Sequence, residues 1–229
     1  MRKYYTRPCN FYYGNYAKKL IDEKKALSLT GRSNIAFDQI EIFNREKKGV
    51  TDSKFHSINK ISEIDRKILT TIEKDLKNIT SKRENISGLR FDIPLLIGVL
   101  NITPDSFSDG GLFFEEAKAY DQVRLMINSG ATIIDIGGES TRPGSKTIDA
   151  KEEWERIKNT IVKFKKKFPK GILSLDTRKS HVMIKGIENG VDIINDVSGL
   201  NFDNKSFDVI NSNKKPFILH HMRGTPSTM

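Results

Sequence analysis

Short apolar segments alternate with amphipathic segments of helical spacing throughout the second half of the sequence. The apolar segments are Leu95–Leu100, Thr132–Ile136, Ile172–Leu175, Val191–Ile194 and Phe217–Leu219. The segments between them with helical spacing are Glu115–Asn128, Lys151–Phe168, Lys179–Glu188 and Asn204–Asn211. Strands this short and apolar, separated by helices, are typical of crossover units on a parallel sheet that is buried on both faces.

A polar loop follows each of these five predicted strands. The loops are rich in Asn, Asp, Ser, Thr, Gly and His, and they cover Asn101–Gly111, Gly137–Ser145, Asp176–Arg178, Asn195–Gly199 and His220–Thr228. In a parallel sheet the loops after the strands converge on one edge, and in a barrel this rim carries the active site. We therefore predict an α/β chain of the (β/α)8 TIM-barrel type, with about the first five β/α units present.

The first part of the sequence has a different character and predicts a small α+β extension. Ile35–Phe43 alternates like a strand, and Ser62–Thr80 has a helical apolar stripe that begins at a capping box formed by Ser62 and Asp65. The polar segment Lys82–Gly88 fits a linker, so we expect domains over residues 1–92 and 93–229. The role of the first domain stays open.

Charge and apolar patterning exclude several classes of function. Residues 1–92 contain 20 Lys and Arg against 12 Asp and Glu, which accounts for most of the net charge of +10. No basic stripe interleaved with aromatic residues accompanies this charge, so nucleic-acid binding is not expected. The longest uncharged apolar run, Ile93–Ile102, is too short for a membrane span, and the first fifteen residues lack the apolar core of a signal peptide. With Cys9 as its single cysteine, the chain forms no intramolecular disulfide, and we expect a cytoplasmic protein.

The first two loops contain the residue types that bind cations and phosphate. Asn101–Gly111 carries Asp105 and Asp109, and it fits either an ordinary polar loop or a lid with oxygen ligands for a hard cation such as Mg2+. Asp135 lies inside a predicted strand, where a carboxylate needs a polar partner. The loop after it contains three side chains that commonly contact phosphate: Ser140, Thr141 and Arg142.

Carboxylates, amides and histidines follow the later strands. Asp176, Asn195 and Asp196 each stand at a strand end, where they could read the donors of an aminopyrimidinone ring; capping of the next helix is the alternative for any one of them. His220 and His221 are adjacent on a strand and so point to opposite faces, which makes them a poor zinc pair. Met222 can line an apolar pocket.

Taken together, these stretches resemble the dihydropteroate synthase family, the pterin-binding barrel enzymes of folate biosynthesis. Asn101–Gly111 and Asp135–Gly144 are similar to the two characteristic loops of that family. Three shorter matches follow in the same order, at 174–177, 193–196 and 221–222. The resemblance covers about residues 95–229. A looser similarity links Tyr5–Gly14 and Ala36-Phe37 to an N-terminal extension of some bacterial members.

The resemblance implies a reaction and a role for each candidate residue. The family joins 6-hydroxymethyl-7,8-dihydropterin diphosphate to 4-aminobenzoate and releases diphosphate, through a dissociative step that leaves a pterin cation. Asp176, Asn195 and Asp135 would bind the pterin and stabilise that cation, and Asn101 would coordinate Mg2+. The remaining implied roles are the diphosphate site of Ser140, Thr141 and Arg142, the loop-organising Asp109, and the arylamine pocket of Phe107 and Pro143. A homodimer is also implied for the complete enzyme.

Later parts of the family pattern do not occur in this sequence, and a barrel of this type needs roughly 250 residues. We therefore expect the chain to be part of a longer enzyme and to show little synthase activity and poor solubility by itself. A non-catalytic pterin-binding fragment and a pterin-dependent methyltransferase are the alternatives. The methyltransferase has no diphosphate to expel, which the loops around Asn101 and Thr141 disfavour.

Overall fold

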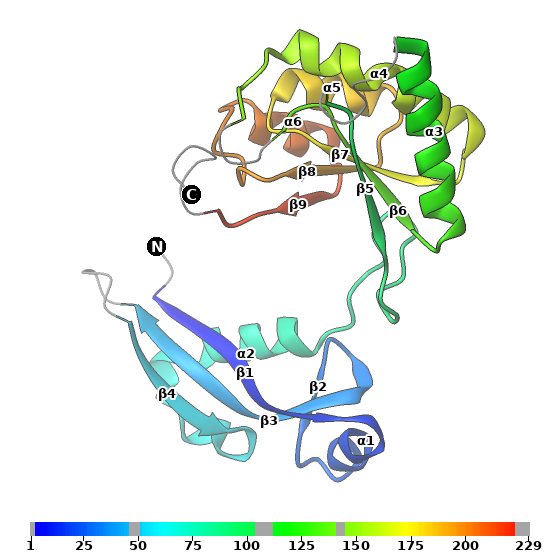
Figure 1. The fold of residues 1–229 in the computed structure, drawn as a ribbon. Coiled ribbons are helices and arrows are strands. Elements are labelled where there is room, and N and C mark those ends of the chain that lie inside the picture. The colour runs from blue at the N-terminus through cyan, green and yellow to red at the C-terminus, as the bar shows by residue number, and fades with distance from the viewer. Residues whose placement is uncertain (1–2, 46–50, 104–111, 141–144, 223–229) are drawn as a thin grey trace. The chain divides into compact units, whose positions relative to one another are not determined.

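The computed structural model describes residues 3–45, 51–103, 112–140 and 145–222. The chain divides into two compact units, Met1–Asn85 and Ile86–Met229 (Figure 1). This division lies a few residues before the expected boundary at 92/93. The reason is that Leu89 is buried with Ile133 and Ile193 in a hydrophobic cluster of the second unit.

A five-stranded parallel sheet forms the second unit. Its strands follow one another in sequence order: β5 (Ile97–Asn101), β6 (Ile133–Gly137), β7 (Ile172–Asp176), β8 (Ile193–Asp196) and β9 (Phe217–Leu219). The helices between them are α3 (Leu112–Asn128), α4 (Ala150–Lys167), α5 (Ser180–Glu188) and α6 (Ser206–Asn213). The predicted α/β class with a partial barrel of five strands is thereby confirmed, and each strand begins within two residues of its predicted start.

The helices lie against one face of this sheet, as Figure 1 shows, and the main core fills the space between them. Ile134, Leu173 and Leu175 of the strands meet Ile161 and Phe164 of α4, and all five are at most 2% exposed. The ends of α4 match its dipole, because the Asp149 side chain accepts from the Glu152 amide at 2.7 Å and three lysines occupy the last turn. No helix among the described residues is long and apolar enough to cross a bilayer.

The opposite face of the sheet is apolar at one end and polar at the other. Side chains alternate along a strand, so Ile133 and Asp135 share this face. Ile133 and Ile193 belong to the cluster with Leu89 at the end where the strands begin. Polar side chains lie on the same face at the carboxyl ends of the strands, and they form the candidate site.

The first unit is an α+β fold built on an antiparallel sheet. Its elements are β1 (Tyr4–Tyr13), α1 (Gly14–Asp22), β2 (Leu27–Leu29), β3 (Arg32–Arg45), β4 (Thr51–Ser57), the 3-10 helix η1 (Ile58–Glu63) and α2 (Arg66–Thr80). The long strand β3 pairs with all three other strands. Phe37, Ile40 and Ile42 of β3 share a core with Ile72 and Leu76 of α2. The aromatic start of the sequence, which has no clear period, forms β1.

The predicted start of the helix at Ser62 is wrong by four residues. Ile64 has extended backbone angles (φ −71°, ψ 143°), which separate η1 from α2. Asp65 is the N-cap residue of α2, and its side chain accepts from the Lys67 amide at 2.9 Å. Asp65 therefore caps the helix itself and does not act as the second member of a box opened by Ser62.

Candidate active site

Four residues lie side by side where strands β5 to β8 end. Asn101 is in register with Gly137, Gly137 with Asp176, and Asp176 with Asn195. Gly137 has no side chain and so leaves space between its neighbours. A Cβ added there would lie 3.4 Å from the Asn101 Oδ1 atom and 3.4 Å from the Asp176 Oδ2 atom. Asn101 and Asp176 therefore border one small gap at the rim of the sheet.

Asp135 lies deeper on the same face, two residues before Gly137. It is 5% exposed, and its Oδ2 atom accepts a hydrogen bond of 2.9 Å from Asn195 Nδ2. Asp135 Oδ1 is buried and has no hydrogen-bond partner among the described residues, and the same holds for the hydroxyl of Ser174, its register neighbour on β7. Buried polar atoms are nearly always paired in proteins, so an unused carboxylate oxygen here is an acceptor available to a ligand N–H group.

Asp176 is a titratable group that its environment perturbs strongly. Burial raises its pKa from 3.8 to about 7, and the negative charges of Asp135, Glu153, Asp196 and Glu139 add to this shift. A carboxyl group that titrates near neutral pH at the rim of a parallel sheet is a recognised mark of a functional site. The sequence predicted Asp176 as a site residue but gave no sign of this pKa.

A buried network of four charged side chains holds the start of the loop after β6. Glu139 Oε2 accepts from Arg178 Nε at 2.9 Å, and Glu139 Oε1 lies 3.0 Å from Lys179 Nζ. Lys179 also pairs with Glu153 at 2.5 Å, and all four residues are at most 9% exposed. Burial alone would raise the pKa of Glu139, but hydrogen bonds from Arg178, Lys179 and the Ile148 amide outweigh it and lower that pKa. Sequence reasoning missed this network, because the two basic residues follow Asp176 by only two and three positions and suggest ligand contacts equally well.

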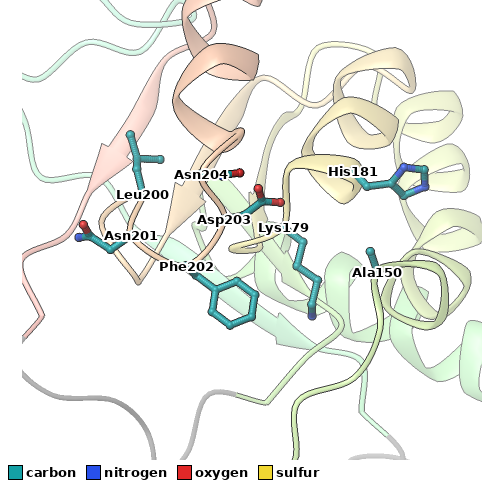
Figure 2. Close-up of a pocket in the computed structure, with 8 residues that line it drawn as sticks. All are labelled: Ala150, Lys179, His181, Leu200, Asn201, Phe202, Asp203 and Asn204. Carbon is teal, nitrogen blue, oxygen red and sulfur yellow. The ribbon is translucent and has the colours of Figure 1, made fainter.

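A pocket of about 670 Å³ lies beside this network (Figure 2). It is lined by Ala150, Lys179, His181, Leu200, Asn201, Phe202, Asp203 and Asn204. Phe202 in its wall stacks on the guanidinium of Arg178, with 3.9 Å between the guanidinium carbon and the ring centre. Asp135, Asp176 and Asn195 are not among these lining residues.

His220 also joins the rim. Its Nε2 atom is 2.7 Å from Asn195 Oδ1, so the imidazole contacts the same amide that donates to Asp135. His220 follows β9 two residues after Ile218, and Ile218 is in register with Asn195. The period of two along the strand could have placed His220 on the face of Asn195, but the sequence interpretation considered this histidine only as a zinc ligand.

The other predicted site residues divide into two groups. Asp109, Phe107, Thr141, Arg142 and Pro143 lie outside the described residues. Ser140 is half-buried, and its carbonyl accepts from the Ser145 hydroxyl at 2.6 Å. Met222 is half-buried and Asn101 is exposed. Within the described ranges, no three His, Cys, Asp or Glu side chains form a cluster that could hold a metal ion.

Comparison with known proteins gives this site a family. Residues 97–229, more than half of the chain, match the pterin binding enzyme family. The chain belongs to the pterin-binding enzymes. It is 44% identical over 134 residues to the dihydropteroate synthase of Synechocystis, covering 58% of this chain and 46% of that protein.

Solved structures of other pterin-binding enzymes agree with this assignment. A Xanthomonas albilineans dihydropteroate synthase with 4-aminobenzoic acid has a TM-score of 0.56 and 36% identity, over 59% of this chain and 49% of that chain. The same enzyme in complex with 7,8-dihydropteroate has a TM-score of 0.52 and 32% identity, over 59% and 48%. This chain therefore spans about half the length of the pterin-binding enzymes that it matches here.

The adjacent glycines of the second loop give a matched test of the packing around the site. A Cβ at Gly138 would lie 2.9 Å from the Glu153 carbonyl oxygen and 2.9 Å from Ile157 Cγ2, whereas the nearest atoms to a Cβ at Gly137 are 3.4 Å away. We expect Gly138→Ala to lower the free energy of unfolding by about 1–3 kcal/mol through overpacking, and Gly137→Ala by less than about 1 kcal/mol. Urea unfolding of both variants measures this, and the reverse order would contradict the packing described.

Proposed function

We propose that the chain is part of a dihydropteroate synthase. It would condense 6-hydroxymethyl-7,8-dihydropterin diphosphate with 4-aminobenzoate to give 7,8-dihydropteroate and diphosphate. One observation carries the proposal: Asp135 and Asn195 are hydrogen-bonded in a buried pair that leaves Asp135 Oδ1 without a partner among the described residues, on the sheet face of a pterin-binding enzyme.

The chemistry of this pair suits the aminopyrimidinone edge of a pterin. That edge presents neighbouring N–H groups, and an ionised carboxylate accepts but does not donate. The open Oδ1 atom of Asp135 is one acceptor, and the carboxyl group of Asp176 at the end of the neighbouring strand is a second. Asn195 is hydrogen-bonded to Asp135 and is in register with Asp176, so it belongs to the same set of polar groups.

The same residues suit a dissociative reaction. The bond between the pterin methylene carbon and the diphosphate oxygen breaks, and both electrons of the bond leave with the diphosphate. The positive charge that remains is shared between the methylene carbon and the ring, where the carboxylates of Asp135 and Asp176 stabilise it. The amine nitrogen of 4-aminobenzoate then bonds to the carbon and releases a proton to solvent.

Magnesium fits the rim through Asn101. The amide oxygen is a hard donor, it is exposed at the end of β5, and it borders the gap above Gly137. Mg2+ keeps several waters and binds substrate phosphates together with few protein oxygens, so a cage of protein ligands is not required. When bound, the ion would neutralise charge on the departing diphosphate. We assign the diphosphate contacts to Ser140, Thr141 and Arg142, the ordering of the loops to Asp109, and the arylamine pocket to Phe107 and Pro143. Met222 would line an apolar part of the substrate site.

Calorimetry with 6-hydroxymethylpterin and with 4-aminobenzoate tests the proposal. We expect the chain to bind the pterin, and Asp135→Asn to weaken that binding about 10- to 150-fold, because a hydrogen bond to a charged acceptor is worth about 1.5–3 kcal/mol. Asp121→Asn is the matched control, since Asp121 is exposed on α3 with its side chain 3.6 Å from Arg124. A folded chain that binds no pterin would contradict the proposal. Pterin binding without any site for 4-aminobenzoate would support pterin recognition and oppose a synthase.

A further inference from the structure

His220 ends a chain of hydrogen bonds that crosses the sheet from β9 to β6. Its Nε2 atom is 2.7 Å from Asn195 Oδ1, and Asn195 Nδ2 is 2.9 Å from Asp135 Oδ2. Asp135 is 5% and Asn195 9% exposed, so the inner part of the chain is shielded from water. The proposed pterin acceptor is therefore connected through one amide to an imidazole.

The carboxylate sets the direction of both hydrogen bonds. Ionised Asp135 can only accept, so the amide of Asn195 must turn its NH2 group towards it. The amide oxygen of Asn195 then faces His220 and needs a donor. Neutral His220 supplies that donor only as the tautomer that carries its proton on Nε2, and the opposite tautomer would place two acceptors 2.7 Å apart.

The backbone of His220 is held independently of its side chain. Gly199, in the loop after β8, has φ +62°, and a Cβ there would lie 2.5 Å from the carbonyl oxygen of His220. Asp196 fixes this loop by accepting from the Ser198 amide at 2.8 Å and from the Ser198 hydroxyl at 2.7 Å. The loop thus packs directly on His220 and keeps the imidazole within reach of Asn195.

We propose that His220 is a positioning residue for pterin recognition. It holds the amide of Asn195 in the one orientation that pairs with Asp135 Oδ2 and leaves Asp135 Oδ1 open to the ligand. Without the imidazole donor, Asn195 Oδ1 has no partner among the described residues, and the bond to Asp135 Oδ2 alone then orients the amide. This role rests on the proposed function, since the pterin is the ligand for which the acceptor is kept open.

Three variants separate the hydrogen bond from the bulk of the side chain. His220→Leu removes the donor and leaves the buried amide oxygen of Asn195 without its hydrogen bond. We expect this loss to weaken 6-hydroxymethylpterin binding about 5- to 20-fold. His220→Gln keeps an N–H group at a similar distance from the backbone, and its affinity should stay within about threefold of the original. His221→Leu, at the exposed neighbouring residue, is the control and should bind as the unchanged chain does.

15N NMR of the ligand-free chain reports the tautomer of His220 and the environment of the Asn195 amide without any pterin. We expect His220 at pH 8 to show the tautomer protonated on Nε2, and the Asn195 side-chain amide signals to shift in His220→Leu but not in His221→Leu. The opposite tautomer, or equal pterin affinity of His220→Leu and the unchanged chain, would overturn the positioning role. If the unchanged chain binds no pterin while the expected tautomer is present, the proposed function fails, and a positioning role in pterin recognition fails with it. If pterin binds and only the variants disagree, the failure belongs to His220 alone.

Discussion

Replacing Asp176 by asparagine is expected to stabilise the ligand-free chain at pH 8 and to weaken its binding of pterin. The pKa of Asp176 is raised from 3.8 to about 7, first by burial and then by the nearby carboxylates. The folded chain therefore holds a proton that the unfolded chain releases between these values, so stability falls as pH rises from about 4 to 7. Asparagine removes this cost. We expect a gain in the free energy of unfolding of about 2 kcal/mol at pH 8 and little gain at pH 4, since one pKa unit corresponds to about 1.4 kcal/mol and solvent still reaches the half-buried carboxyl group.

The effect on binding has the opposite sign. If the ionised form of Asp176 accepts from the pterin, the affinity of the unchanged chain should fall about tenfold between pH 8 and pH 6, because protonation competes with the ligand below a pKa of about 7. Asp176→Asn should bind weakly at both pH values. Chemical unfolding and calorimetry at pH 4, 6 and 8 measure both effects, with the exposed Asp121→Asn as control. A variant that is no more stable than the unchanged chain at pH 8 would show that the carboxyl group carries no such cost.

The fold could be predicted from the sequence because its strands are short, apolar and regularly spaced. A parallel strand that is buried on both faces has a continuous apolar sequence, and each of these strands ends where polar residues begin. The predicted bounds of β5 to β9 therefore lie close to the observed ones. The first unit was harder. Apolar and polar residues do not alternate regularly along Tyr4–Tyr13, although this segment forms β1. Within it, Asn10 has a φ of +58°, which departs from the extended backbone of a strand. The start of α2 at Arg66, with Asp65 as its N-cap, depends on the extended backbone of Ile64, which residue types do not reveal.

The site could be predicted only to the level of residue types at strand ends. Strand register alone brings Asn101, Asp176 and Asn195 together, and the sequence supports that much. The contacts that decide the chemistry are longer in range. His220 reaches Asn195 across 25 residues, and Arg178 reaches Glu139 across 39. Hydrogen bonds of this kind depend on the angle at which a side chain leaves its loop, and no local pattern encodes that angle.

Replacing Glu139 by alanine is expected to be among the most destabilising single changes in the second unit. Its carboxylate lies between Arg178 Nε at 2.9 Å and Lys179 Nζ at 3.0 Å. Its removal leaves Lys179 paired with Glu153 and leaves buried Arg178 with no carboxylate partner among the described residues. Breaking a buried ion pair from one side costs about 3–5 kcal/mol, whereas the exposed pair of Glu152 with Arg156 is worth less than about 1 kcal/mol. Glu152→Ala is therefore the matched control in urea unfolding at pH 7.

The stabilisation by Glu139 should also depend on pH. The pKa of Glu139 is lowered, so its contribution to the free energy of unfolding should be present above about pH 4.5 and be lost as pH falls further. Equal losses from the two alanine variants would mean that the network is not holding the loop after β6.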